Sequence, residues 1–128
     1  MGINSTEVAY NFGQLGSVFL DTATAITPPT NKVFVAITML ADTTFDSHGG
    51  LIAQQDSAGS GLEYISTEDD SGAAQTAHDA SGGSETTSTG SGGVVVDVSN
   101  SFPEGLTIFG RWTEIDLASG MIIAYIGD

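Results

Sequence analysis

The stretch Phe102-Pro-Glu-Gly-Leu-Thr-Ile-Phe-Gly-Arg-Trp-Thr-Glu-Ile-Asp-Leu-Ala-Ser-Gly-Met-Ile-Ile-Ala-Tyr-Ile126 decides the fold of this chain. It predicts, in order, a turn, a strand interrupted by a glycine, a tight glycine turn and a closing strand that is apolar throughout. The turn, Asn100–Gly105, carries Pro103 at its position i+1 and Gly105 at i+3, which suits type I.

The interrupted strand, Leu106–Leu117, changes the phase of its alternation half way. Leu106 and Ile108 fall on one face of a regular strand, and Ile115 falls with Leu117 on the other. A β-bulge at Gly110 would restore the phase and turn all four side chains toward the core. After it, Gly120 can take a positive φ, so Ala118–Gly120 is expected to close a short hairpin into Met121–Ile126.

The remaining periodic segments are also typical of strands. The best central strand is Lys32–Leu40, which is apolar on both faces and therefore requires cover from a second sheet and a loop or from a neighbouring subunit. Further strands are expected at Thr6–Tyr10, Gly16–Leu20, Thr43–Phe45, Leu51–Ala53, Leu62–Ile65 and Val94–Val98.

One long segment breaks this pattern. Ser66–Gly93 contains no apolar side chain larger than alanine, so its composition predicts a polar, low-complexity loop excursion. Short strands, many glycine turns and the lack of an amphipathic helical pattern together predict an all-β fold. We expect an antiparallel β-sandwich or a jelly-roll-like arrangement, as a single domain over residues 1–128.

The charge of the chain limits its partners. Sixteen acidic residues face only Lys32 and Arg111, which gives a formal net charge of −14. Binding to phosphates requires cations, so a nucleic-acid partner is excluded, and an anionic membrane surface would repel the chain. No cysteine is present, which excludes disulfides and thiolate metal sites. The N-terminus lacks the basic start and apolar core of a signal peptide, so no secretory address is expected.

The residues that could carry chemistry form no recognisable catalytic pattern. His48 follows Asp46 and Ser47, and His78 precedes Asp79, but serine and aspartate are so frequent here that chance supplies these neighbours. No Gly-x-Ser-x-Gly elbow accompanies them. We therefore expect no catalytic residue and no enzymatic activity.

Calcium is the one ion that the acidic residues could bind, because it prefers hard oxygen ligands. The candidates are Asp42 and Asp46, or the run Glu68, Asp69 and Asp70. Neither group matches an EF-hand loop or a calcium-binding repeat. Solvated acidic loops are the default interpretation, and no cofactor is expected.

Arg111 and Trp112 stand out because they are the only arginine and the only tryptophan of the chain. In so acidic a protein Arg111 is expected to pair with a carboxylate, within the fold or across a subunit contact. Arginine and aromatic residues are also enriched among interface anchors. The residues expected to contact a partner are Arg111, Trp112, Phe109, Tyr125 and Lys32.

The run from Ile108 to Gly127 resembles the C-terminal end of small virion proteins from tailed marine bacteriophages, in particular those of cyanobacteria. In that pattern an aromatic-Gly-Arg-aromatic step precedes a short strand, a glycine turn and an apolar strand ending in Tyr-x-Gly. The resemblance implies a virion structural protein, and among these we favour a capsid decoration (cement) protein.

Such a decoration protein is implied to be small, β-rich and often a homotrimer that bridges subunits of the major capsid protein from the capsid exterior. The strands Val33–Leu40 and Met121–Ile126 would carry the core or the trimer contact, and the loops would grip the shell. Two alternatives stay open. One is a phage tail, fibre or receptor-binding component, and the other is an extracellular carbohydrate-binding module with Trp112 as its stacking platform.

Overall fold

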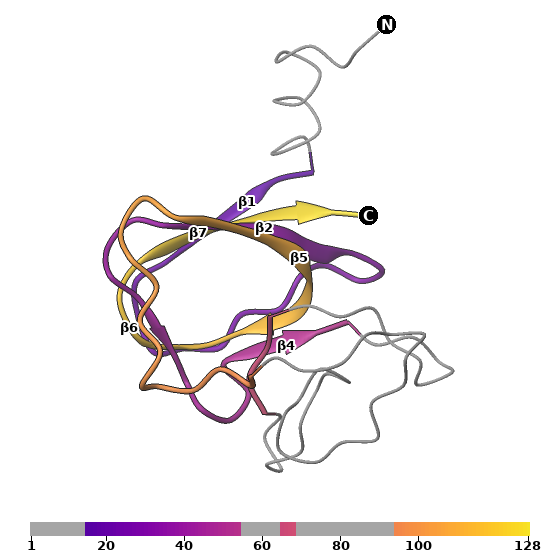
Figure 1. The fold of residues 1–128 in the computed structure, drawn as a ribbon. Helices are drawn as coiled ribbons and strands as arrows, with labels where there is room; N and C mark the ends of the chain where they lie inside the picture. Colours follow the sequence, from indigo (N-terminus) through magenta and orange to yellow (C-terminus); the bar gives the residue numbers. More distant parts are fainter. Residues whose placement is uncertain (1–14, 55–64, 69–93) are drawn as a thin grey trace, which may run out of the picture.

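The computed structural model describes residues 15–54, 65–68 and 94–128, and these residues form an all-β, antiparallel fold, as predicted (Figure 1). The strands are β1 (Ser17–Leu20), β2 (Val33–Met39), β3 (Thr44–Phe45), β4 (Leu51–Ala53), β5 (Thr107–Ile115), β6 (Leu117–Ser119) and β7 (Ile122–Gly127). A search of the described residues for a helix long and apolar enough to cross a membrane finds none.

The strands, which Figure 1 shows end-on, enclose one apolar core. A five-stranded sheet in the order β1-β7-β2-β5-β4 forms most of the wall, and a two-stranded sheet of β3 and β6 completes it. β2 lies in the middle of the large sheet, which confirms the expectation that Lys32–Leu40 contains the central strand. The core includes Phe34, Ile37, Phe45, Leu51, Trp112, Ile115 and Ile122, all of them fully buried.

Extra residues in successive strands curve the large sheet. Two rows of paired core residues cross it: Ile126, Phe34 and Trp112 form one row, and Ala124, Ile37 and Ile108 form the next. Between these rows β7 advances by two residues, β2 by three and β5 by four. Each insertion is a β-bulge, which bends its strand and increases the local twist. The large sheet can therefore wrap around the core.

The bulge predicted at Gly110 is confirmed, because β5 changes register against β2 between Phe109 and Trp112. A Cβ atom on Gly110 would lie 2.7 Å from the ring of Trp112, so the glycine lets the indole fold back under the strand. A second change of register, against β4, follows at Thr113. The bulges turn Ile108, Ile115 and Leu117 into the core as expected, but Leu106 is 37% exposed.

The predicted hairpin between Leu106–Leu117 and Met121–Ile126 is wrong. β2 lies between β5 and β7, and β6 pairs with β3 in the small sheet. The chain changes sheets at Asp116, whose backbone N–H donates to the Gly50 carbonyl while its own carbonyl accepts from the Asp46 N–H. Gly120 does take a positive φ, of +105°, as predicted.

The turn after Phe102 is displaced by one residue from the prediction. Its hydrogen bond runs from the Leu106 N–H to the Pro103 carbonyl, 3.2 Å. Gly105 is therefore the third residue of the turn, and its φ of +88° has the sign that a type II turn requires. The Gly105 N–H donates instead to the Met39 carbonyl of β2.

Two further expectations need correction. Val94–Val98 forms no strand, and neither does Ile65, the one described residue of Leu62–Ile65. Ser66 and Thr67 open the supposed polar excursion, yet they are 1% and 0% exposed because they lie against β4. The rest of that excursion, and the strand expected at Thr6–Tyr10, lie outside the described residues.

Candidate protein-contact surface on the outer face of the sheet

The face of the large sheet that points away from the core carries a set of uncharged side chains, which we call the outer face. Two rows of paired residues form it across β1, β7, β2 and β5, which Figure 1 shows side by side. The first row is Ser17, Tyr125, Ala36 and Phe109, and the second is Phe19, Ile123, Thr38 and Thr107.

Aromatic residues dominate the outer face. Phe109 is 62% exposed and Phe19 is 56% exposed, at opposite corners of the two rows. Between Tyr125 and Phe109 lies Ala36, which is only 2% exposed because its two cross-strand neighbours are large. In the second row the hydroxyls of Thr38 and Thr107 share a hydrogen bond of 2.9 Å, which lowers their demand for water.

This composition is typical of protein-protein contacts. The cores of such interfaces are depleted in charged residues and enriched in aromatic ones. None of the eight outer-face residues is charged, although the chain carries a net charge of −14. The outer face is therefore a candidate surface for contact with another protein.

Of the five residues predicted to contact a partner, Phe109 and Tyr125 lie together on the outer face. Lys32 lies beyond the start of β2, where its ammonium group forms an ion pair with the Asp128 carboxylate. That pair joins the start of β2 to the end of the chain, close to the pairing of Val33 with Gly127. Lys32 thus holds two strand ends together at the rim of the sheet.

Trp112 has a structural role, which corrects its assignment as an interface anchor. Its side chain is 0% exposed in the core, and its indole Nε1–H donates to the Ile65 carbonyl at 2.7 Å. A buried indole cannot act as a stacking platform for a sugar, so the expectation attached to a carbohydrate-binding module is wrong on this point.

Arg111 binds a different partner from the one expected. Its Nε–H donates to Oε1 of Gln54 at 2.6 Å, and the Gln54 N–H donates to the Arg111 carbonyl at 2.7 Å. The partner seen among the described residues is thus an amide and not a carboxylate. These two bonds fasten Gln54, the residue after β4, alongside the bulged part of β5.

The residues considered for catalysis and for metal binding support the backbone. His48 Nε2 lies 3.1 Å from Glu68 Oε2, and Ser47 Oγ accepts a hydrogen bond from the Val98 N–H. The Asp46 carboxylate accepts a hydrogen bond from the His48 N–H, and the Asp42 carboxylate accepts one from the backbone N–H of Glu104.

Among the described residues, no three or more His, Cys, Asp or Glu side chains gather into a group that could hold a metal ion. Of the second candidate calcium group only Glu68 is described, and it pairs with His48. Asp69 and Asp70 lie outside the described residues, as do His78 and Asp79.

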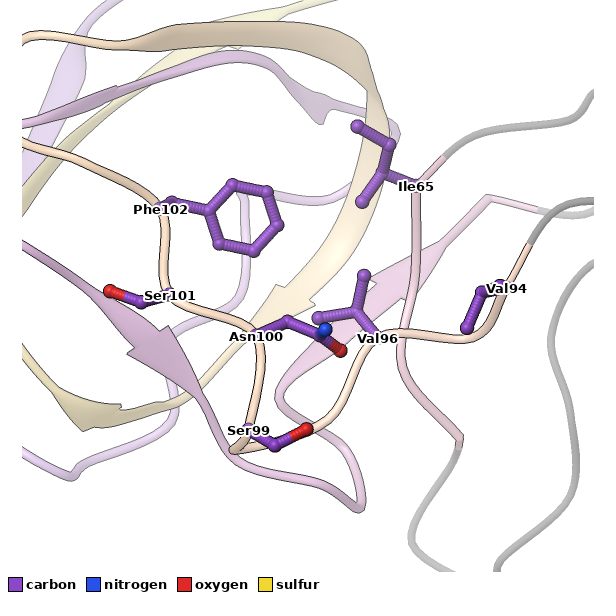
Figure 2. Close-up of a pocket in the computed structure, with 7 residues that line it drawn as sticks. All are labelled: Ile65, Val94, Val96, Ser99, Asn100, Ser101 and Phe102. Atoms are coloured by element: carbon purple, nitrogen blue, oxygen red, sulfur yellow. The ribbon is translucent and has the colours of Figure 1, made fainter.

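Sequence reasoning missed an open hollow of about 420 Å³ beside the small sheet. Figure 2 shows Ile65, Val96 and Phe102 turned toward one another in it, and its other lining residues are Val94, Ser99, Asn100 and Ser101. Two of its polar side chains already serve the local turn, because Asn100 Oδ1 accepts from the Asp97 N–H and the Ser99 hydroxyl donates to Asp97. The hollow is therefore lined by both apolar side chains and polar groups.

Sequence reasoning also missed Phe19, although a signal for it was present. Val18, Phe19 and Leu20 are consecutive apolar residues, and a strand turns alternate side chains to opposite faces. Since Leu20 is buried, Phe19 has to point outward.

Comparison of the chain with protein-family models, with curated proteins and with solved structures finds no match.

Proposed function

We propose that this chain is a virion structural protein, namely a capsid decoration protein that binds the outside of a tailed-phage head as an oligomer and stabilises the shell. The observation that carries the proposal is the uncharged, aromatic outer face on a strongly acidic molecule. The stretch on which the resemblance rests, Ile108–Gly127, supplies three residues of that face: Phe109, Ile123 and Tyr125.

The charge of the chain favours the exterior of the shell. Packaged DNA would repel a protein of net charge −14, so the capsid exterior is the compatible side. Stabilisation follows from mass action, because a protein that binds only the assembled shell adds its binding free energy to that state and none to the dissociated subunits.

The proposal is tested by adding the purified chain to undecorated, expanded heads of a tailed phage that carries such a protein. We expect the number of bound copies to approach that of the major capsid protein, and we expect the temperature of shell disruption to rise with occupancy. A fully occupied shell that is no more heat-stable than a bare one would overturn the proposal. A copy number far below that of the capsid protein would indicate a tail or fibre component instead.

A matched pair of variants connects the binding to the outer face. Phe109→Ser removes the most exposed aromatic ring of that face and should weaken binding to the shell at least tenfold. Val94→Ser is the control, because Val94 is an apolar residue that is 78% exposed and lies outside the outer face. We expect Val94→Ser to bind like the unaltered chain.

A further inference from the structure

β1 forms one edge of the large sheet, and the hydrogen bonds define which of its backbone groups point outward. The Ile126 N–H donates to the Gly16 carbonyl at 2.9 Å, so Gly16 directs its backbone groups toward β7. Along an antiparallel strand this direction alternates, and Val18 and Leu20 therefore bond to β7 as well. The N–H and C=O groups of Ser17 and Phe19 must point to the other side. Among the described residues, only β7 pairs with β1.

The two edges of the large sheet are treated differently. The edge at β4 is covered, because the Thr67 N–H donates to the Leu51 carbonyl at 2.9 Å and the Thr67 hydroxyl accepts from the Leu51 N–H at 3.0 Å. β1 has the sequence Ser-Val-Phe-Leu, which contains neither a charge nor a proline. Proteins usually protect exposed edges with charges, prolines or bulges, since an open edge is a template for another strand. None of the described residues protects this edge, and Phe19 beside it is exposed, so the edge and Phe19 together form a surface that another strand could cover.

We propose that the strand covering this edge is β1 of a second copy of the chain, in an antiparallel pairing that places Phe19 opposite Phe19 of the other copy. In this register Val18 lies opposite Leu20 of the second copy, and Ser17 lies opposite Asp21. The outward groups of Phe19 form two hydrogen bonds across the twofold axis. The two outer faces then continue into one surface with a pair of phenylalanine rings at its centre, a favourable cross-strand pair.

The charge distribution limits where two copies of the chain can meet, and this edge is one such place. Two molecules of net charge −14 repel each other over most of their surfaces, and the least repulsive contact joins uncharged patches. β1 and the outer face provide such a patch. The nearest acid, Asp21, would lie about 14 Å from Asp21 of the other copy, given four residues of strand rise between the paired positions. That separation exceeds the Debye length at physiological ionic strength, about 8 Å.

The contact is isologous, so it closes after two copies and predicts a dimer and not a trimer. It is also small. Four-residue strands bury far less than the roughly 800 Å² per partner of a stable interface, so the dimer is expected to be weak in dilute solution. On a shell, neighbouring copies are held at a high effective concentration, at which a weak contact suffices.

Single-cysteine variants test this register directly, because the chain has no cysteine of its own. In the proposed pairing the two Cα atoms of residue 19 are about 5.5 Å apart, within the range of a disulfide. Under mild oxidation we expect Phe19→Cys to form a covalent dimer. Ser17→Cys is the matched control on the same strand and face, and it should stay largely monomeric because its partner position is Asp21. Linkage of Ser17→Cys as fast as Phe19→Cys would overturn the register.

A second variant tests the edge itself. The Phe19 N–H points away from β7, so Phe19→Pro removes no hydrogen bond between β1 and β7, as for a proline with its N–H side on an open edge. By sedimentation velocity at rising concentration, we expect the unaltered chain to form dimers and Phe19→Pro to remain monomeric with at least a tenfold weaker association. Persistent dimers in Phe19→Pro, trimers of the unaltered chain, or an unaltered chain that stays monomeric together with a Phe19→Cys variant that forms no disulfide-linked dimer would each overturn the proposal. These measurements need no phage particles, so they are independent of the test of the virion role.

Discussion

At Gly120 the chain leaves the small sheet with a φ of +105°, a backbone conformation that residues other than glycine rarely adopt. A Cβ atom here would lie 2.6 Å from the Cα of Thr43 and 2.8 Å from the carbonyl oxygen of Asp42. Because these are backbone contacts, the structure cannot relax by a change of rotamer. We predict that Gly120→Ala lowers the free energy of unfolding by about 3 kcal/mol or more, measured by urea denaturation.

Gly105 is the matched control for this prediction. Its φ is +88°, but a Cβ atom there would meet nothing within 4 Å. Gly105→Ala therefore carries only the backbone penalty, about 1 kcal/mol. Equal losses in the two variants would show that contact with the Thr43 segment does not contribute.

Among the described residues, Asp97 is the one whose pKa differs clearly from its ordinary value. The Ser99 hydroxyl and the Ser99 backbone N–H both donate to its carboxylate and lower its pKa. A lowered pKa stabilises the fold above the unfolded value of about 4, and this contribution disappears as the pH falls through the folded value. We predict that the difference in urea midpoint between the unaltered chain and Asp97→Asn is largest at pH 5 to 7 and closes as the pH falls through the lowered pKa of the folded state. A difference that is independent of pH would contradict this.

At the scale of elements, the segment 65–68 covers the β4 edge of the large sheet and forms hydrogen bonds with it. Thr67 is fully buried, and its hydroxyl accepts from the Leu51 N–H and donates to the Glu68 carbonyl at 2.9 Å. Thr67→Val keeps the shape but leaves the Leu51 N–H without its acceptor. We predict a loss of about 1–3 kcal/mol in the free energy of unfolding, with faster hydrogen exchange at Leu51.

The neighbouring residue supplies the control for that substitution. Ser66 is also buried, and its hydroxyl oxygen has no hydrogen-bond partner among the described residues. Ser66→Ala should therefore be neutral or slightly stabilising, since it removes a polar group that is already desolvated. A similar loss in both variants would mean that the packing of the segment matters and not the hydrogen bond of Thr67.

The sequence predicts strands better than it predicts their partners. Periodicity located β2 and β7, because short segments with apolar residues at alternate or at all positions are typical of strands. The change of phase in Leu106–Leu117 located the bulge. The hairpin failed because it assumed that neighbouring strands pair. Pairing depends on contacts distant in sequence, here the insertion of β2 between β5 and β7. Val94–Val98 is apolar but gains one hydrogen bond to Ser66 instead of a ladder.

The candidate surface was predictable only in part, for a related reason. Phe109 and Tyr125 were among the residues expected to contact a partner, and the register brings them to either side of Ala36. Trp112 was misassigned because a one-residue bulge at Gly110 would place it on the face opposite Ile108. The bulged part of β5 instead keeps Trp112 on the core side with Ile108, and no alternation count reveals how many residues a bulge contains. Phe19 joins the set only once β1 is known to pair with β7.

At the scale of the whole molecule, self-repulsion among sixteen acidic residues opposes the compact fold. The unfolded chain spreads these charges apart, so screening by salt should stabilise the folded state more than the unfolded one. We predict that the urea midpoint rises as NaCl increases from about 0.01 M to about 0.15 M, where the Debye length falls from about 30 Å to about 8 Å. A chelator in every sample of the salt series keeps calcium from contributing. In a separate comparison without salt variation, a lower urea midpoint with chelator than without it would indicate a bound divalent cation.

A charge-reduced variant separates screening from other effects of salt. Asp21 and Glu104 are exposed, so Asp21→Asn combined with Glu104→Gln lowers the net charge without disturbing the core. If repulsion limits stability, this variant starts from a higher urea midpoint at low salt and its midpoint rises less with added NaCl.

The same screening should strengthen the pairing of two β1 edges, so dimer formation and the urea midpoint should rise together with salt in the unaltered chain. A midpoint that stays flat or falls with NaCl would show that the acidic surface is already accommodated in the folded monomer, and the charge argument for the outer face would lose its basis.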